Sequence, residues 1–198
     1  MTETIKAWHF VGDRLRDDRP VPPDGMWLRH DGAVEICASG LHASRQPWDA
    51  LRYAPGATLC YVECRGDIHE HYDKLVCRER RIIMRADVTE TLRYFARMQA
   101  LSVVHLWASE LPDVVLDYLM TGDESLRSAA SAAARGAASD AASDAASAAV
   151  WFAASAAARA AARAVASAEA SDAASAATWD AVGQEFDALV CEQFGVEA

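Results

Sequence analysis

The chain has 198 residues, a net charge of −10 and 52% apolar residues, which fits one domain with an extension or two small domains. It contains no long basic run, so its composition argues against sequence-independent binding to a nucleic-acid backbone. No signal-peptide pattern or apolar stretch of transmembrane length occurs, and the five cysteines are irregularly spaced. We therefore expect no membrane association, reduced thiols and a cytoplasmic location.

The first 126 residues predict an α+β head domain, because strand patterns come first and helix patterns second. Short apolar runs bounded by Gly, Pro and Asp indicate the strands of a small mixed or antiparallel sheet. In chain order we first expect a strand at 5–12, a hairpin over 26–40 that turns at Asp31-Gly32, and a helix from Pro47 to Tyr53. A strand at 58–64 and a strand or pair of strands over 74–88 follow. The head then ends with a helix from Thr89 to Leu106 and a shorter helix after Pro112.

Residues 127–198 form an alanine-rich tail. Residues 127–182 contain 30 alanines and 9 serines, arranged in fourteen tetrads in one register. Alanine favours helix, but a period of four drifts by roughly 40° per tetrad on a helix of about 3.6 residues per turn. One long helix therefore cannot hold its alanine stripe against one partner.

The tail is accordingly expected to form a helical hairpin or small bundle, completed by a second subunit in a homo-oligomer. Gly136 and Gly183 are candidate breaks between its helices. A frayed spacer is the alternative. Four large aromatic residues are the candidates for packing or oligomer contacts: Trp151, Phe152, Trp179 and Phe186.

Cys60, Cys64, His69 and His71 form a C-x3-C-x4-H-x-H string that offers zinc ligands. The spacing fits no standard zinc pattern, and Cys60, Val62 and Cys64 share one face of a predicted strand. Cysteines in that arrangement are typical of a core. We therefore interpret them as core residues, with the histidines in a loop, and expect no metal and no cofactor.

Two histidines and several arginines are candidates for one pocket that takes an anionic ligand, because the arginine fork suits phosphate and carboxylate. Structural histidines and a solvated basic strand face are the alternatives. The candidate ligand-binding residues are His9, His42, Tyr53, Glu63, Arg78, Arg80 and Arg81. The sequence contains no recognisable phosphate loop or nucleophile motif, so the catalytic residues are unknown.

Six segments of the head resemble a family of uncharacterised phage and prophage proteins: AWHFVGDRLRDDRPVPPDG, SGLHAS, YAPGATLCYVECRG, DKLVCRERRI, LRYFARMQAL and VVLDYLMTGDESLR. The alanine-rich tetrads that follow TGDES are similar in that family too. The resemblance implies a phage or mobile-element setting in a bacterial host, where small acidic proteins often disarm defences. It implies no activity.

A fold-level likeness links the head to ADP-ribosyltransferases, through Trp8-His9, GLHASRQPWDALRYA and LCYVECRG. His42 stands where that family usually has Tyr, and no clear catalytic Glu follows. The likeness implies an NAD-consuming enzyme in which His9 and His42 orient the nucleotide and Glu63 or Glu79 is the acidic group.

Three functions follow as hypotheses. The first is an accessory counter-defence protein that captures a host defence protein or a nucleotide signal without turnover. The second is the ADP-ribosyltransferase-like enzyme. The third is a structural protein that assembles through its tail.

Overall fold

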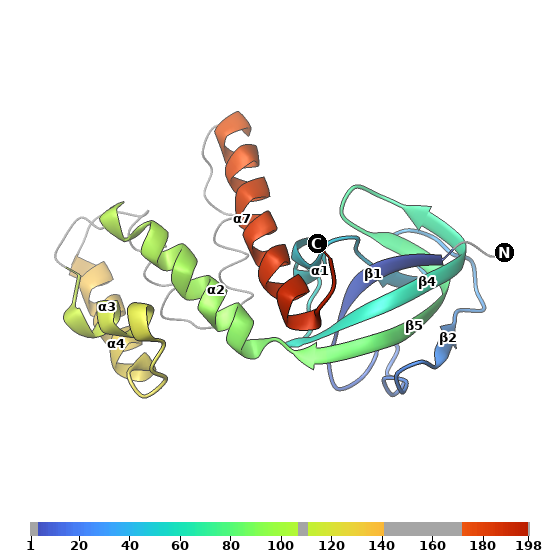
Figure 1. Ribbon diagram of the computed structural model, residues 1–198, viewed down its shortest axis with the longest axis horizontal. Helices are drawn as coiled ribbons and strands as arrows, with labels where there is room; N and C mark the ends of the chain where they lie inside the picture. Colours follow the sequence, from blue (N-terminus) through green and yellow to red (C-terminus); the bar gives the residue numbers. More distant parts are fainter. Residues whose placement is uncertain (1–3, 107–110, 141–171, 198) are drawn as a thin grey trace. The chain divides into compact units, whose positions relative to one another are not determined.

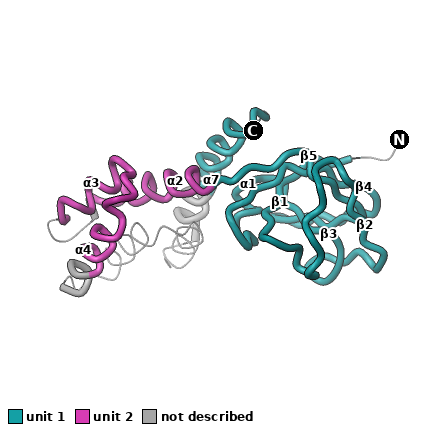
Figure 2. The backbone as a smooth tube through the Cα atoms, turned by 90° about the horizontal axis from the view of Figure 1, so that it is seen from below, with its two compact units in different colours: residues 1–88, 180–198 teal, residues 89–179 magenta. Residues whose placement is uncertain are grey.

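The computed structural model describes residues 4–106, 111–140 and 172–197, with the side chains of 106, 136–140 and 172–179 left out of the description. Backbone contacts divide the chain into two compact units, residues 1–88 with 180–198 (unit 1) and residues 89–179 (unit 2) (Figure 2). The antiparallel sheet and helices described below confirm the expected α+β class of the head.

Unit 1 is built on an antiparallel sheet with the order β1-β4-β5-β2 (Figure 1). A short strand, β3, pairs with β5 and also reaches β1, because Trp8 and Ser44 exchange backbone hydrogen bonds of 2.7 and 2.9 Å. The sheet therefore curls toward closure. Its strands are β1 (Thr4–Val11), β2 (Trp27–Arg29), β3 (Leu41–Ala43), β4 (Thr58–Glu70) and β5 (Leu75–Asp87).

The hairpin expected over residues 26–40 is wrong. β2 pairs with β5, with Trp27 opposite Arg81 and Arg29 opposite Glu79, while Glu35 and Ser39 form an isolated bridge in the following loop. The long edge of β5 offers β2 a partner, and this pairing packs Leu28 against the core of the sheet. A nonlocal ladder thus replaces the local turn.

One face of the sheet forms the core of unit 1. Side chains alternate between the faces of a strand, so Ile5, Ala7 and Val11 of β1 share a face with Cys60, Val62 and Cys64 of β4. β3 and β5 add Leu41, Ala43, Leu75, Cys77 and Ile82 to this cluster. We call this the inner face.

Two helices cover part of the opposite, outer face: α1 (Pro47–Leu51) and α7 (Asp172–Phe194). The ring centroids of Trp8 and Phe194 lie 5.1 Å apart, and those of Trp48 and Phe186 lie 5.9 Å apart. Phe186, Val190 and Phe194 recur at helical spacing and are buried, so residues 180–198 pack with the sheet. The sequence analysis had placed these residues with the tail.

Unit 2 contains α2 (Thr89–Ser102), a 3-10 turn (Val104–Leu106), α3 (Asp113–Thr121) and α4 (Arg127–Asp140). α2 begins where predicted but ends before Leu106, and the chain tightens into the 3-10 turn. Tyr118 and Leu119 of α3 pack with Ala130 and Ala134 of α4. Alanine permits the close approach of these two helices.

Gly136 and Gly183 do not break helices, so that expectation is wrong. Gly136 lies within α4 and Gly183 within α7. A Cβ added at Gly183 would lie 2.6 Å from Cδ1 of Trp48, which explains glycine there as a packing requirement. Trp151 and Phe152 lie outside the described residues, as does the side chain of Trp179.

Within the described part of the chain, no helix combines the length and apolar character needed to cross a membrane.

Replacing Gly183 with alanine tests this packing. Helix propensity alone favours alanine over glycine by about 1 kcal/mol. The clash with Trp48 reverses the sign, and we expect Gly183→Ala to lower the free energy of unfolding by roughly 1–3 kcal/mol in urea denaturation. Gln184→Ala, at the exposed neighbouring position, serves as the control. A stabilised Gly183→Ala protein would contradict the Trp48 contact.

Asp187 makes the docking of α7 depend on pH. Its Oδ1 accepts a 2.7 Å hydrogen bond from the Trp48 N–H, yet burial and then Asp49 raise its pKa to about 6. The folded state therefore holds this proton more tightly than the unfolded state, whose pKa is near 3.8, and the group destabilises unit 1 above pH 6. Its contribution becomes more favourable as the pH falls through 6.

Asp187→Asn keeps the acceptor and removes the charge. We expect it to stabilise the protein by about 1–3 kcal/mol at pH 7.5, and by little at pH 4, in denaturation measured at both values. Asp180→Asn, at an exposed position of the same helix, is the matched control. An equal effect of Asp187→Asn at both pH values would argue against the raised pKa.

Candidate functional site

The register of β4 against β5 sends neighbouring arginines to opposite faces of the sheet. Arg80 lies opposite Cys64, a member of the inner face, and Arg81 lies opposite Glu63 on the outer face. Because side chains alternate along a strand, each of these two arginines meets a different environment. The candidate residues therefore fall into separate groups.

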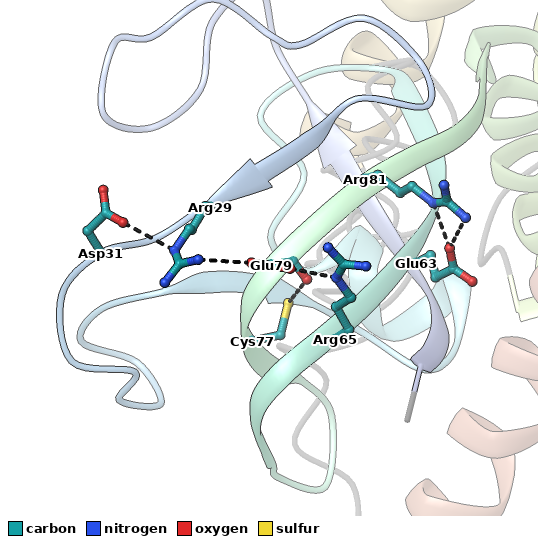
Figure 3. A network of polar contacts seen from close by, with 7 residues as sticks. All are labelled: Arg29, Asp31, Glu63, Arg65, Cys77, Glu79 and Arg81. Atoms are coloured by element: carbon teal, nitrogen blue, oxygen red, sulfur yellow. Dashed lines mark hydrogen bonds and ion pairs between the residues drawn. The ribbon is translucent and has the colours of Figure 1, made fainter. Parts of the chain in front are cut away.

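On the outer face, Glu63 joins two cations from neighbouring strands. It accepts a 2.6 Å hydrogen bond from Nε of Arg81 and forms a 3.3 Å ion pair with Lys6 (Figure 3 shows the Arg81 contact). Burial raises the pKa of Glu63, but the hydrogen bonds from Arg81 and Lys6 outweigh it and leave the pKa lowered. Glu63 is therefore a paired carboxylate rather than a proton acceptor at neutral pH.

A second carboxylate repeats this arrangement two residues along the ladder. Glu79 pairs with Arg65 at 2.5 Å and with Arg29 at 3.4 Å, and Arg29 also contacts Asp31 (Figure 3). The guanidinium carbons of Arg65 and Arg81 lie 3.8 and 4.8 Å from the centroid of a Trp27 ring. Trp27 thus connects the two groups through cation–π contacts.

On this face, the cationic side chains are more exposed to solvent than the carboxylates of Glu63 and Glu79. The side chains of Glu63 and Glu79 are 10% and 19% exposed, whereas those of the four cations are 36–63% exposed. At these six positions solvent therefore meets mainly cationic groups, although the whole chain carries a charge of −10 and Asp31, beside Arg29, is 91% exposed. We call this surface the Trp27 face: Lys6, Trp27, Arg29, Glu63, Arg65, Glu79 and Arg81.

His9, His42 and Arg80 form a second group. His9 lies opposite Cys60 on the inner face, and Arg80 donates from Nη1 to the carbonyl oxygen of His42. Burial lowers the pKa of His9 well below 6.5, and the nearby Arg80 and His42 lower it further. Burial also lowers the pKa of His42, with a smaller contribution from Arg80. Both histidines are therefore neutral beside a buried arginine.

Tyr53 belongs to a third group, at the end of the β4–β5 hairpin. Its hydroxyl donates to the buried carboxylate of Asp73 at 2.5 Å and accepts from Lys74 at 3.0 Å. Burial raises the pKa of Tyr53, and the bond to Asp73 raises it further, so this hydroxyl is not activated as a base.

Arg78 holds a loop in place. Its guanidinium donates to the carbonyl oxygens of His30 and Gly32 at 3.3 and 3.0 Å, and it pairs with Asp67 at 3.1 Å. These contacts of Arg78 are therefore structural, and the seven candidate ligand residues do not share one pocket.

The cysteines and histidines of the C-x3-C-x4-H-x-H string are separated. Cys60 and Cys64 are buried in the core, while half-exposed His69 and His71 lie beside Asp67 and Asp73. Burial raises the pKa of the Cys60 thiol to about 11, which disfavours a thiolate ligand. Among the residues that the structure describes, no group of three or more metal-ligating side chains comes together.

The sequence analysis missed Lys6, Trp27, Arg29 and Arg65 as members of a site. A signal was present: Glu63-x-Arg65 and Glu79-x-Arg81 place opposite charges at a spacing of two, so each pair shares a strand face. The pairing of β2 with β5 brings in Trp27 and Arg29. Residue spacing within one segment could not predict this pairing, because the two strands are far apart in the sequence.

Comparison with known protein families gives a match to part of the chain. Residues 5–94 match the model of a family described as a domain of unknown function, DUF7666. The matched region begins in β1, ends in α2 and contains the Trp27 face together with His9, His42 and Arg80. No curated protein and no solved structure matches the chain.

The pairing of Glu63 with Arg81 can be measured by a double-mutant cycle. With Glu63→Gln and Arg81→Met, we expect a coupling of about 1 kcal/mol in the free energy of unfolding at pH 7. The lowered pKa of Glu63 predicts that this coupling is lost only as the pH falls below 4.5, because protonation then removes the charge.

The exposed pair Arg14–Asp18, with N···O at 3.7 Å, provides the control cycle. We expect it to show almost no coupling, because both side chains are largely in solvent. Equal coupling in the two cycles would contradict a special role for the partly buried Glu63.

Proposed function

We propose that this protein is an accessory counter-defence protein, encoded by a phage or mobile element, that captures a host defence protein without turnover. The Trp27 face carries the proposal: its cations lie outermost, and its carboxylates lie beneath them. Tryptophan and arginine are enriched among the residues that dominate protein–protein binding energy. The resemblance to phage proteins supports the setting.

The charge of this face specifies the partner's chemistry. An acidic protein surface complements exposed Lys6, Arg29, Arg65 and Arg81, and complementary charge steers association. A nucleic-acid strand fits less well, because Glu63 and Glu79 already neutralise part of the charge and the chain is acidic overall. A nucleotide signal is the other ligand expected from sequence, and the Trp27 face does not favour it over a protein.

The geometry argues against the ADP-ribosyltransferase-like alternative. That reading needs Glu63 or Glu79 to act beside His9 and His42 on one nucleotide. Glu63 and Glu79 lie on the outer face and are held by cations, whereas His9 faces the core. The sheet separates the acid from the histidine that would orient the substrate.

Assembly through the tail remains part of the proposal. Both described ends of the alanine-rich run are helical, in α4 and α7, which supports helices packed by their alanine faces as a hairpin, a bundle or a homo-oligomer. Phe186 is buried in unit 1 and packs against Trp48 of the same chain. It is therefore not exposed for a contact with a second subunit. We also propose a cytoplasmic location in the host. The support is the same resemblance to phage proteins that supports a host defence protein as the partner.

The test uses affinity purification of the full chain from host cells, followed by reconstitution with the recovered protein. We expect a stoichiometric complex in native mass spectrometry, with a Kd that weakens at least tenfold for Arg65→Glu and for Trp27→Ala. The association rate of the wild-type complex should fall with rising salt.

Arg14→Glu is the matched control, because it makes the same charge change in an exposed loop outside the Trp27 face. It should weaken binding by less than threefold, as a general charge effect. Equal losses for Arg14→Glu and Arg65→Glu would contradict docking on this face. Recovery of nucleic acid in place of a protein, or NAD consumption with the recovered partner, would contradict the proposed function itself.

A further inference from the structure

Arg80 is a buried cation without a carboxylate partner. Only 6% of its surface is exposed, and no ion pair to it occurs among the described residues, although nearly every other arginine of unit 1 has one. Burying a guanidinium without an anion is costly, and burial lowers its pKa accordingly. Its position therefore lacks a structural explanation based on charge pairing.

The one hydrogen bond of Arg80 fixes the direction of its guanidinium. Nη1 donates to the carbonyl oxygen of His42, which anchors one side of the plane to β3. Nε and Nη2 then form the free edge, and they have no hydrogen-bond partner within the described chain. Two parallel N–H donors on this edge match two oxygens of a phosphate or carboxylate group.

Solvent or a ligand has to satisfy this free edge, because a buried N–H donor without a hydrogen-bond partner is costly. Among the described side chains, Oδ1 of Asp73 is the one buried polar atom that has neither solvent contact nor a hydrogen bond. Nε and Nη2 of Arg80 do not belong to that class of fully enclosed, unbonded atoms.

Arg80 lies among histidine and cysteine side chains rather than carboxylates. His9 is held uncharged and provides one N–H donor, and the sulfurs that interact with Arg80 belong to the buried Cys60, Cys64 and Cys77. No acidic side chain competes for the guanidinium here, in contrast to the Trp27 face. Among the described residues, the inner face thus offers one free fork, one additional donor and no carboxylate that pairs with Arg80.

We infer that unit 1 contains an oxyanion site in which the Nε–Nη2 edge of Arg80 binds a phosphate group, with His9 as a second donor. The phosphate comes either from free inorganic phosphate or from a nucleotide. This site is separate from the Trp27 face, so it does not depend on the proposed capture of a protein.

The test measures thermal unfolding and calorimetric binding of the full chain in inorganic phosphate, with chloride at the same ionic strength as the reference. For the wild type, the unfolding midpoint should rise with the logarithm of phosphate concentration. AMP distinguishes the source of the phosphate group: AMP binding at least tenfold tighter than inorganic phosphate assigns a nucleotide, and equal affinity assigns the free ion.

Three variants make the result specific. Arg80→Met should abolish the phosphate effect, and its midpoint in chloride should equal or exceed that of the wild type, since the uncompensated charge is gone. Arg80→Lys keeps the charge but loses the fork, and it should bind phosphate at least tenfold more weakly. Arg14→Met, in an exposed loop, should bind like the wild type.

Wild-type protein that responds to phosphate no more than to chloride would overturn the inference, even if Arg80→Met fails to fold. Phosphate binding that persists in Arg80→Lys with unchanged affinity would overturn it as well. In either case Arg80 would serve to hold the His42 carbonyl, with Cys64, Cys77 and Cys60 as its electrostatic neighbours.

Discussion

The pairing of β4 with β5 is the constraint on which both candidate sites depend. It places Arg81 opposite Glu63 and Arg80 opposite Cys64, so two consecutive arginines face solvent and core respectively. A shift of one residue would exchange them, burying the ion-paired groups and exposing the cysteines. The hydrophobic side chains of the inner face hold the register, because only one register buries Val62, Cys64 and Ile82 together.

The outer face of the same sheet has an apolar part that is covered and a part that carries paired charges. Near Trp8 and Tyr61, whose ring centroids are 4.7 Å apart, α7 provides an apolar cover through Phe194. Farther along the strands, the outer face carries paired charges around Trp27. Residues near the end of α7 thus cover the apolar part of the outer face, while the cations around Trp27 stay exposed to solvent.

Local patterns predicted much of this architecture. The α+β class, the strand at the start and the helix start at Thr89 follow from alternation and turn chemistry, and the structure confirms them. For residues 74–88 the sequence left one strand or two open, and the structure has the single strand β5. The hairpin at Asp31-Gly32 failed because β2 gains more from the edge of β5 than from its neighbour in sequence. Gly183 was misread as a break because the indole that needs the space, Trp48, is distant in sequence.

For the candidate site residues too, local sequence patterns predicted the strand face but not the nonlocal partners. Alternation was sufficient to assign Cys60 and Cys64 to one strand face, and both are buried. It could not reveal which arginine would lack a carboxylate, because the partners of Arg81 and Arg85 come from β4 and from a loop before β2. Charge pairing across strands depends on tertiary register, which no single segment encodes.

The central claim is that Arg80 and Arg81 face different environments, one free to bind an anion and one already paired. The most direct measurement is NMR of the guanidinium Nε–Hε groups of the full chain during a phosphate titration at constant ionic strength. The account predicts that the Arg80 signal shifts and exchanges more slowly with solvent, while the Arg81 and Arg65 signals stay unchanged. A shift of Arg81 or Arg65 with no change at Arg80 would contradict it.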